Sequence, residues 1–117
     1  MSEQQFKFPA LYQFFAGYFY QGWAAGYRWD GAAPEFSAVV RHFRAVNPPA
    51  AVEEVRRELA ALRAAALTES ALDEILAALG SGFYPPAAGL TSREWLDRIV
   101  EILDESPTKA RVLRELG

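Results

Sequence analysis

Apolar residues recur every three or four positions along most of this chain, with polar side chains between them. This is the spacing of an amphipathic α-helix, in which the apolar residues form one stripe along the helix. Proline and glycine interrupt the pattern and divide it into about six predicted helices. No stretch sustains an alternation of apolar and polar residues, so no strand is predicted. The pattern predicts an all-α fold: one compact domain over residues 1–117, built as a bundle of about six helices.

Prolines, glycines and capping residues set the predicted helix boundaries. Proline is tolerated in the first turn of a helix, where its missing N–H costs nothing. Residues 91–94 have the Thr-x-x-Glu form of a capping box, in which two side chains satisfy backbone N–H groups at a helix start. Gly80 stands just after the end of a predicted helix, a position at which glycine is favoured. Gly17 lies inside a predicted helix and indicates that another helix approaches closely there. The helices are expected to begin at Pro9, Pro34 and Pro49, after the N-caps Thr68 and Thr91, and at Pro107, with loops at 21–33 and 81–90.

Charge and composition narrow the classes of partner. The chain has no cysteine, which excludes disulfides, thiol nucleophiles and thiolate metal sites. Its net charge is −3, and residues 48–80 carry six acidic side chains against three basic ones. No continuous basic stripe runs along the sequence, so nucleic acid is not an expected partner. The acidic middle either favours a cationic partner or only keeps the helix faces soluble.

Neither a membrane span nor an export signal is predicted. The most apolar stretch, residues 6–25, contains two glutamines and two glycines, which makes it a poor bilayer span. The first residues lack a basic segment followed by an apolar one, as a signal peptide would have. We therefore expect a cytoplasmic protein that does not bind membranes.

No residue pattern points to a catalytic or metal centre. His42 is the only histidine, and no carboxylate or second histidine stands one turn away on its predicted helix. Glu54 and Glu58 share a helix face, as do Asp97 and Glu101. These faces lie opposite the apolar stripes and are expected to be solvated, so these carboxylates lack the burial that acid–base catalysis needs. The sequence predicts no enzyme, no cofactor and no metal.

The aromatic residues are concentrated in the first part of the chain. Their number there is larger than one helix face can bury. Tyr20, Trp23, Tyr27 and Trp29 lie in or beside a glycine-rich segment. Partly exposed tyrosine and tryptophan are typical of the residues that contribute most to protein–protein binding. These four side chains either fold back over a small core or take part in an interface.

A resemblance to a known family begins at residues 8–23, which read Phe-Pro-Ala-Leu-Tyr-Gln-Phe-Phe-Ala-Gly-Tyr-Phe-Tyr-Gln-Gly-Trp. This segment resembles the opening of the α-helical immunity proteins of bacterial contact-dependent growth inhibition systems, the CdiI-type proteins. Three later blocks agree in order: Glu-Leu-x-x-Leu at 58–62, Gly-x-Tyr-x-Pro at 82–86 and Thr-x-Arg-Glu-Trp-Leu at 91–96. The resemblance spans residues 8–103, and the predicted helix from Pro107 has no counterpart in it.

The resemblance implies a cytoplasmic antitoxin whose partner is a protein. In such systems a neighbouring cell delivers a toxic C-terminal domain, often a nuclease, and the immunity protein binds it and covers its active site. In the family an acidic residue commonly precedes the tryptophan, whereas Gly22 stands there in this chain, so Asp30 or Glu35 would supply the carboxylate. The residues expected to bind the toxin are Tyr20, Trp23, Tyr27, Trp29, Asp30, Glu35 and Tyr84.

Three alternatives stay open at this level. The chain could be a non-catalytic adaptor whose helical surface binds another cytoplasmic protein. It could be an enzyme with a site assembled from distant residues, such as His42 with Asp30 or Tyr84. It could also be a helical nucleic-acid-binding domain, although its charge does not favour this.

Overall fold

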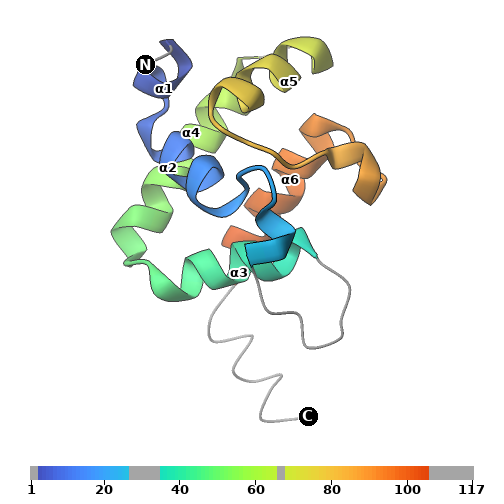
Figure 1. The fold of residues 1–117 in the computed structure, drawn as a ribbon. Helices are drawn as coiled ribbons and strands as arrows, with labels where there is room; N and C mark the ends of the chain where they lie inside the picture. The colour runs from blue at the N-terminus through green and yellow to red at the C-terminus, as the bar shows by residue number, and fades with distance from the viewer. Residues whose placement is uncertain (1–2, 27–34, 66–67, 106–117) are drawn as a thin grey trace.

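The computed structural model describes residues 3–26, 35–65 and 68–105, and within these ranges the fold is all-α, as predicted (Figure 1). The described residues form six α-helices, and a single 3₁₀ turn lies between the second and third helices and another between the fifth and sixth. In chain order the elements are α1 (Glu3–Lys7), α2 (Pro9–Tyr18), η1 (Trp23–Gly26), α3 (Phe36–Val46), α4 (Pro49–Ala64), α5 (Glu69–Ala78), η2 (Pro85–Ala88) and α6 (Ser92–Leu103).

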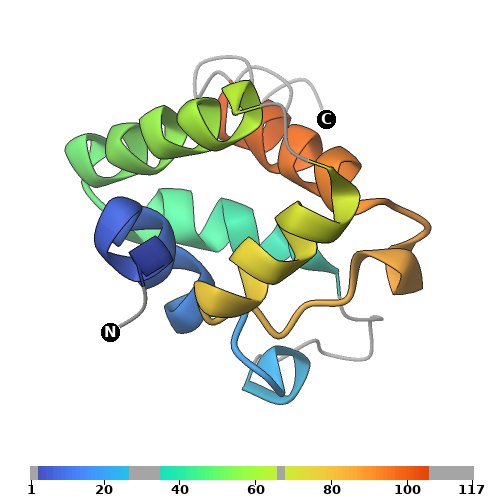
Figure 2. The ribbon, with the colours of Figure 1, turned by 90° about the horizontal axis from the view of Figure 1, so that it is seen from above.

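Helix α6 packs against α3, α4 and α5, and η2 leads into it. Helix α4 packs against both α2 and α6, while α1 lies against α2 and α5. Figures 1 and 2 show the helices grouped around a common interior. Side chains from these neighbouring helices reach both ends of α6.

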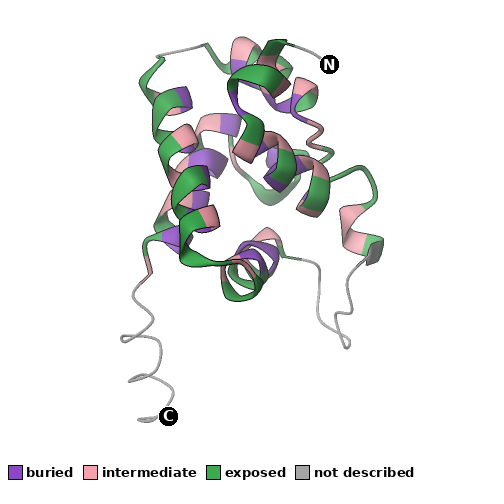
Figure 3. Ribbon diagram, turned by 90° about the vertical axis from the view of Figure 1, so that its left-hand side faces the viewer, coloured by how far each residue is buried: buried purple, intermediate pink, exposed green. Residues whose placement is uncertain are grey.

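The predicted apolar stripes form the core. Figure 3 shows buried positions along the inward faces of the helices and exposed ones along their outer faces. Trp95 lies at the centre, fully buried and stacked on the ring of Phe83 with 4.4 Å between the ring centroids. The fully buried core side chains include Leu11, Phe15, Phe19, Val39, Val40, Leu59, Leu62, Leu72, Leu79, Trp95, Leu96 and Ile99.

Several predicted boundaries need correction. Helix α1 was not expected, and both predicted loops contain a 3₁₀ turn. The helix predicted from Pro34 begins at Phe36, because Glu35 has the extended backbone of an N-cap residue, with φ −133° and ψ 129°. The N-caps Thr68 and Thr91 are confirmed. The segment from Pro107 lies outside the described residues.

The close approach predicted at Gly17 is wrong, because nothing lies within 4 Å of the position that a Cβ would take there. The close approaches occur instead at Gly80 and Gly82. Gly80 follows α5 with φ +87°, and a Cβ on it would lie 2.8 Å from the Ala16 methyl. The N–H of Gly82 donates to the carbonyl of Phe19, at the end of α2. These contacts hold the segment after α5 against the turn after α2.

Candidate partner-binding surface

Two carboxylates of α5 hold the N-terminus of α6. Both oxygens of Glu69 accept hydrogen bonds from backbone N–H groups, that of Ser92 at 2.9 Å and that of Arg93 at 3.0 Å. The Ser92 hydroxyl hydrogen-bonds Asp73. The predicted capping box is also present, since Thr91 and Glu94 each accept the other's backbone N–H. The first turn of α6 thus has its otherwise unpaired N–H groups satisfied from within and from α5.

Glu58 has the same role at α2. It was expected to be solvated, but its carboxylate accepts the N–H groups of Ala10 at 3.2 Å and Leu11 at 3.0 Å. Asp97 was expected to be solvated as well; its side chain is 44% exposed and also forms an ion pair with Arg63 of α4 at 2.8 Å. The expectation for Glu58 was wrong because it considered one helix alone, whereas α4 packs against α2.

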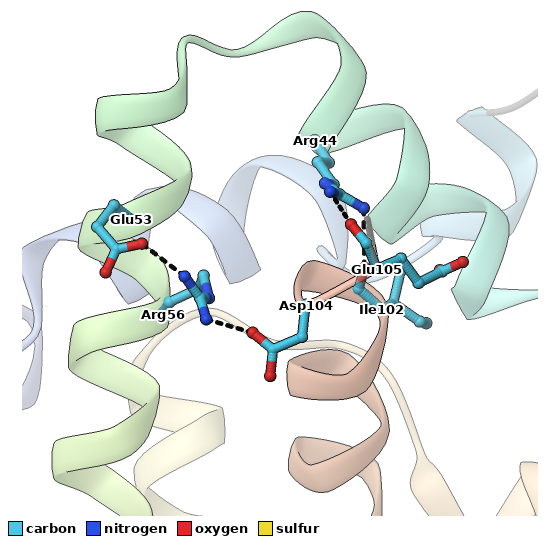
Figure 4. A network of polar contacts seen from close by, with 6 residues as sticks. All are labelled: Arg44, Glu53, Arg56, Ile102, Asp104 and Glu105. Carbon is cyan, nitrogen blue, oxygen red and sulfur yellow. Dashed lines mark hydrogen bonds and ion pairs between the residues drawn. The ribbon is translucent and has the colours of Figure 1, made fainter. Parts of the chain in front are cut away.

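Basic side chains hold the other end of α6, as Figure 4 shows. Arg44 of α3 donates to the backbone carbonyl of Ile102 at 3.3 Å and to that of Glu105. Arg56 of α4 bonds Asp104 and also Glu53, 2.7 Å away. Hydrogen bonds to Glu53 and Asp104 raise the pKa of Arg56 above its ordinary value. Cations at a helix C-terminus oppose the partial negative charge of the last carbonyls.

An open groove of about 760 Å³ lies between α5 and the chain that leads through η2 into α6. Figure 2 shows the chain leaving α5 and turning back alongside it to reach η2. We call this the acidic groove. Its lining includes Glu69 and Asp73 of α5, Tyr84, Pro85 and Leu90 from the connection, and Glu94 of α6. None of the ion pairs between described residues involves its three carboxylates.

Two tyrosines predicted to contact a partner are exposed. Tyr84 is 69% exposed and lines the acidic groove, and Tyr20 is 39% exposed. The backbone of Tyr20 lies against Gly82, two residues before Tyr84.

The other predicted contact residues have different positions. Trp23 is half-buried, and its ring packs at 5.6 Å from the ring of Phe19 and at 5.6 Å from that of Phe83. It therefore covers the core with one face. Glu35 is exposed at the start of α3. Tyr27, Trp29 and Asp30 lie outside the described residues.

Sequence reasoning missed the acidic groove. A signal was present, because residues 64–92 contain three carboxylates and no lysine or arginine. The groove itself depends on the folding back of the connection onto α5, which no local pattern encodes.

Among the described residues, the histidine and the carboxylates form no cluster that suggests metal chemistry. His42 is exposed on α3, with its ring 6.4 Å from that of Tyr18. Across the described ranges, no three histidine, aspartate or glutamate side chains are grouped as metal ligands would be. No helix in the same ranges has the length and apolar character needed to cross a membrane.

Comparison with known proteins places the chain in a family. Its fold is similar to that of a chain in the crystal structure of the CdiA-CT/CdiI complex from Y. kristensenii 33638. The TM-score is 0.72 at 24% sequence identity, over 84% of this chain and 99% of that one. The curated proteins include no match to this sequence. A family model described as CdiI immunity protein matches residues 7–103, which include α2 to α6. This chain therefore belongs to the family of CdiI immunity proteins.

Proposed function

We propose that this protein neutralises the cognate C-terminal toxin domain of a contact-dependent growth inhibition system by binding it in a stoichiometric complex. The observation that carries this proposal is the family match, which takes in α2 to α6 and the acidic groove. The similar fold of a chain in the CdiA-CT/CdiI complex from Y. kristensenii 33638 supports it.

Inhibition by binding requires surface complementarity and no chemistry of its own. An immunity protein that covers the active site of a toxin excludes the substrate, so it needs no catalytic residue, metal or cofactor. We propose that the toxin is a nuclease and that the complex forms in the cytoplasm, where nucleic acid is within its reach. The substrate groove of a nuclease is typically basic, and an acidic surface complements it in charge.

We propose that the toxin contacts the aromatic and acidic side chains predicted from the sequence. The exposure of Tyr20, Tyr84 and Glu35 supports this part of the proposal. Exposed tyrosines supply a large contact area with little loss of conformational freedom. The full proposed set is Tyr20, Trp23, Tyr27, Trp29, Asp30, Glu35 and Tyr84.

The test is coexpression with the toxin domain encoded beside this chain. Cells that express the toxin domain alone should stop growing, and cells that also express this protein should grow. The two chains should copurify in a one-to-one complex. A folded protein that neither restores growth nor copurifies with the toxin would contradict the proposal and favour an adaptor with another partner.

Charge reversal tests the two carboxylates proposed in place of the family's acidic residue. Replacing Asp30 and Glu35 by lysine should weaken toxin binding by about 1–3 kcal/mol without unfolding the protein. Isothermal titration with the toxin domain measures this change, and circular dichroism verifies the fold. Unchanged affinity would remove both residues from the interface.

A further inference from the structure

We infer that the acidic groove receives a basic segment of the toxin domain, with lysine or arginine side chains directed at Asp73 and Glu94. This inference rests on the proposed function, because it assumes that a toxin domain is the partner. It adds where on the bundle the partner binds and which chemistry recognises it.

The shape of the groove fits several side chains of a partner. Its volume of about 760 Å³ lies within the 300–1,000 Å³ range of pockets that enclose small ligands. Leu76, Pro85 and Leu90 contribute an apolar lining, while the carboxylates come from α5 and α6. A long basic side chain suits such a site, since its aliphatic stem can cover apolar surface while its head group reaches a carboxylate.

The three carboxylates of the groove are held in place by hydrogen bonds, but two of them keep an acceptor oxygen for a partner. Glu69 is occupied at both oxygens by backbone N–H groups of α6, so we regard it as structural. Asp73 receives the Ser92 hydroxyl at Oδ1, and Glu94 receives the Thr91 N–H at Oε1. Within the described part of the chain, no donor is hydrogen-bonded to the second carboxylate oxygen of Asp73 or of Glu94. A carboxylate accepts through both oxygens, so Asp73 and Glu94 can still bind a cation.

Charge complementarity identifies the occupant. Three carboxylates line the groove, and no ion pair between described residues neutralises them. Tyr84 stands at the same site with 69% of its surface exposed. An aromatic ring beside carboxylates favours a lysine or arginine, because the cation gains from both the negative charge and the face of the ring. A neutral or acidic partner would gain from neither.

The experiment measures the affinity of the toxin domain for the full chain and for two charge-matched double variants. In the first, Asp73→Asn with Glu94→Gln removes two charges from the groove and keeps the acceptor for Ser92 and the capping box, which tolerates glutamine. In the control, Glu54→Gln with Glu101→Gln removes two charges from exposed helix positions outside the groove. Melting curves verify that all three proteins are folded.

The groove variant should bind the toxin about tenfold or more weakly, and its affinity should depend less on ionic strength than that of the parent chain. The control should remain within about twofold of the parent. Equal losses in both variants would overturn the inference, because net charge alone would then explain binding. Parent-like affinity of the groove variant at low and high ionic strength would overturn it too. If the parent chain itself fails to bind the toxin domain, the proposed function fails, and this outcome is distinct from the other two.

Discussion

The two ends of α6 are both held by charged side chains from other helices, but they differ in the charge that remains. At the C-terminal end, Arg56 and Arg41 pair with the carboxylates of Asp104 and Glu105, which follow the helix. Arg44 donates to backbone carbonyls at the same end. At the N-terminal end, Glu69 and Asp73 meet N–H and O–H groups, which are uncharged donors. Charge is therefore neutralised at one end and left in excess at the other.

This difference is the basis for the structural role and the binding role that we propose for the two ends. Charges that are paired within the fold help to position α6, and they attract a charged partner only weakly. Carboxylates that accept only uncharged donors are fixed in direction and keep their negative charge, which acts on a cation outside the fold. The exposed Tyr84 lies at the N-terminal end, so charge and aromatic surface coincide there. Four substitutions test this contrast.

Trp95→Ala should have the largest effect, because it removes the buried ring beneath the N-terminal end of α6. We expect a loss of about 3–5 kcal/mol in the free energy of unfolding, measured by urea denaturation. Trp95→Phe is the matched control and should lose less, since the indole N–H has no hydrogen-bond partner in the described structure. If Trp95→Ala unfolds at the same urea concentration as the parent, the packing described for α6 is wrong.

Tyr84→Ala should weaken toxin binding by about 2 kcal/mol, because it removes an exposed ring that a partner can bury. Stability should change by less than about 0.5 kcal/mol, because the side chain is 69% exposed. Phe6→Ala is the control, since Phe6 is 80% exposed on α1, which contributes no residue to the groove lining. Surface plasmon resonance with the toxin domain compares them, and equal losses would contradict a role specific to the N-terminal end of α6.

Arg44→Met should cost about 1–3 kcal/mol of stability, because the carbonyls of Ile102 and Glu105 lose their donor while the aliphatic stem is kept. Toxin affinity should stay at the parent value, since this end of α6 has a structural role. Thermal unfolding and titration with the toxin domain measure the two quantities. The exposed Arg57→Met serves as the control. A loss of affinity without a loss of stability would reverse the roles assigned to the two ends.

Arg56→Met should have the smallest effect, at most about 1 kcal/mol, because its ion pairs with Glu53 and Asp104 are exposed to solvent. The effect should shrink as salt is added, since surface pairs are screened. Denaturation at two ionic strengths measures it. A loss above about 2 kcal/mol would mean that this network contributes far more than a surface ion pair.

The sequence by itself predicted α2 to α6 and much of the core, and it missed α1. The three- and four-residue spacing of apolar side chains predicted which face of each helix is buried, and Trp95 is fully buried as expected. The capping box at Thr91 and the cap at Thr68 were predictable because each involves residues three positions apart. Tyr20 and Tyr84 were among the residues expected to bind the toxin, and both are exposed.

Only the tertiary structure decided which helix ends the carboxylates satisfy. Glu58 caps α2 from 47 positions away along the chain, and Glu69 caps α6 from 23 positions away. Such a bond depends on the relative placement of two helices, and that placement results from packing of the whole core. The acidic groove arises for the same reason, because the connection after α5 folds back over it. Local spacing determines a helix and its faces, whereas contacts between distant segments determine which charges are paired and which are left for a partner.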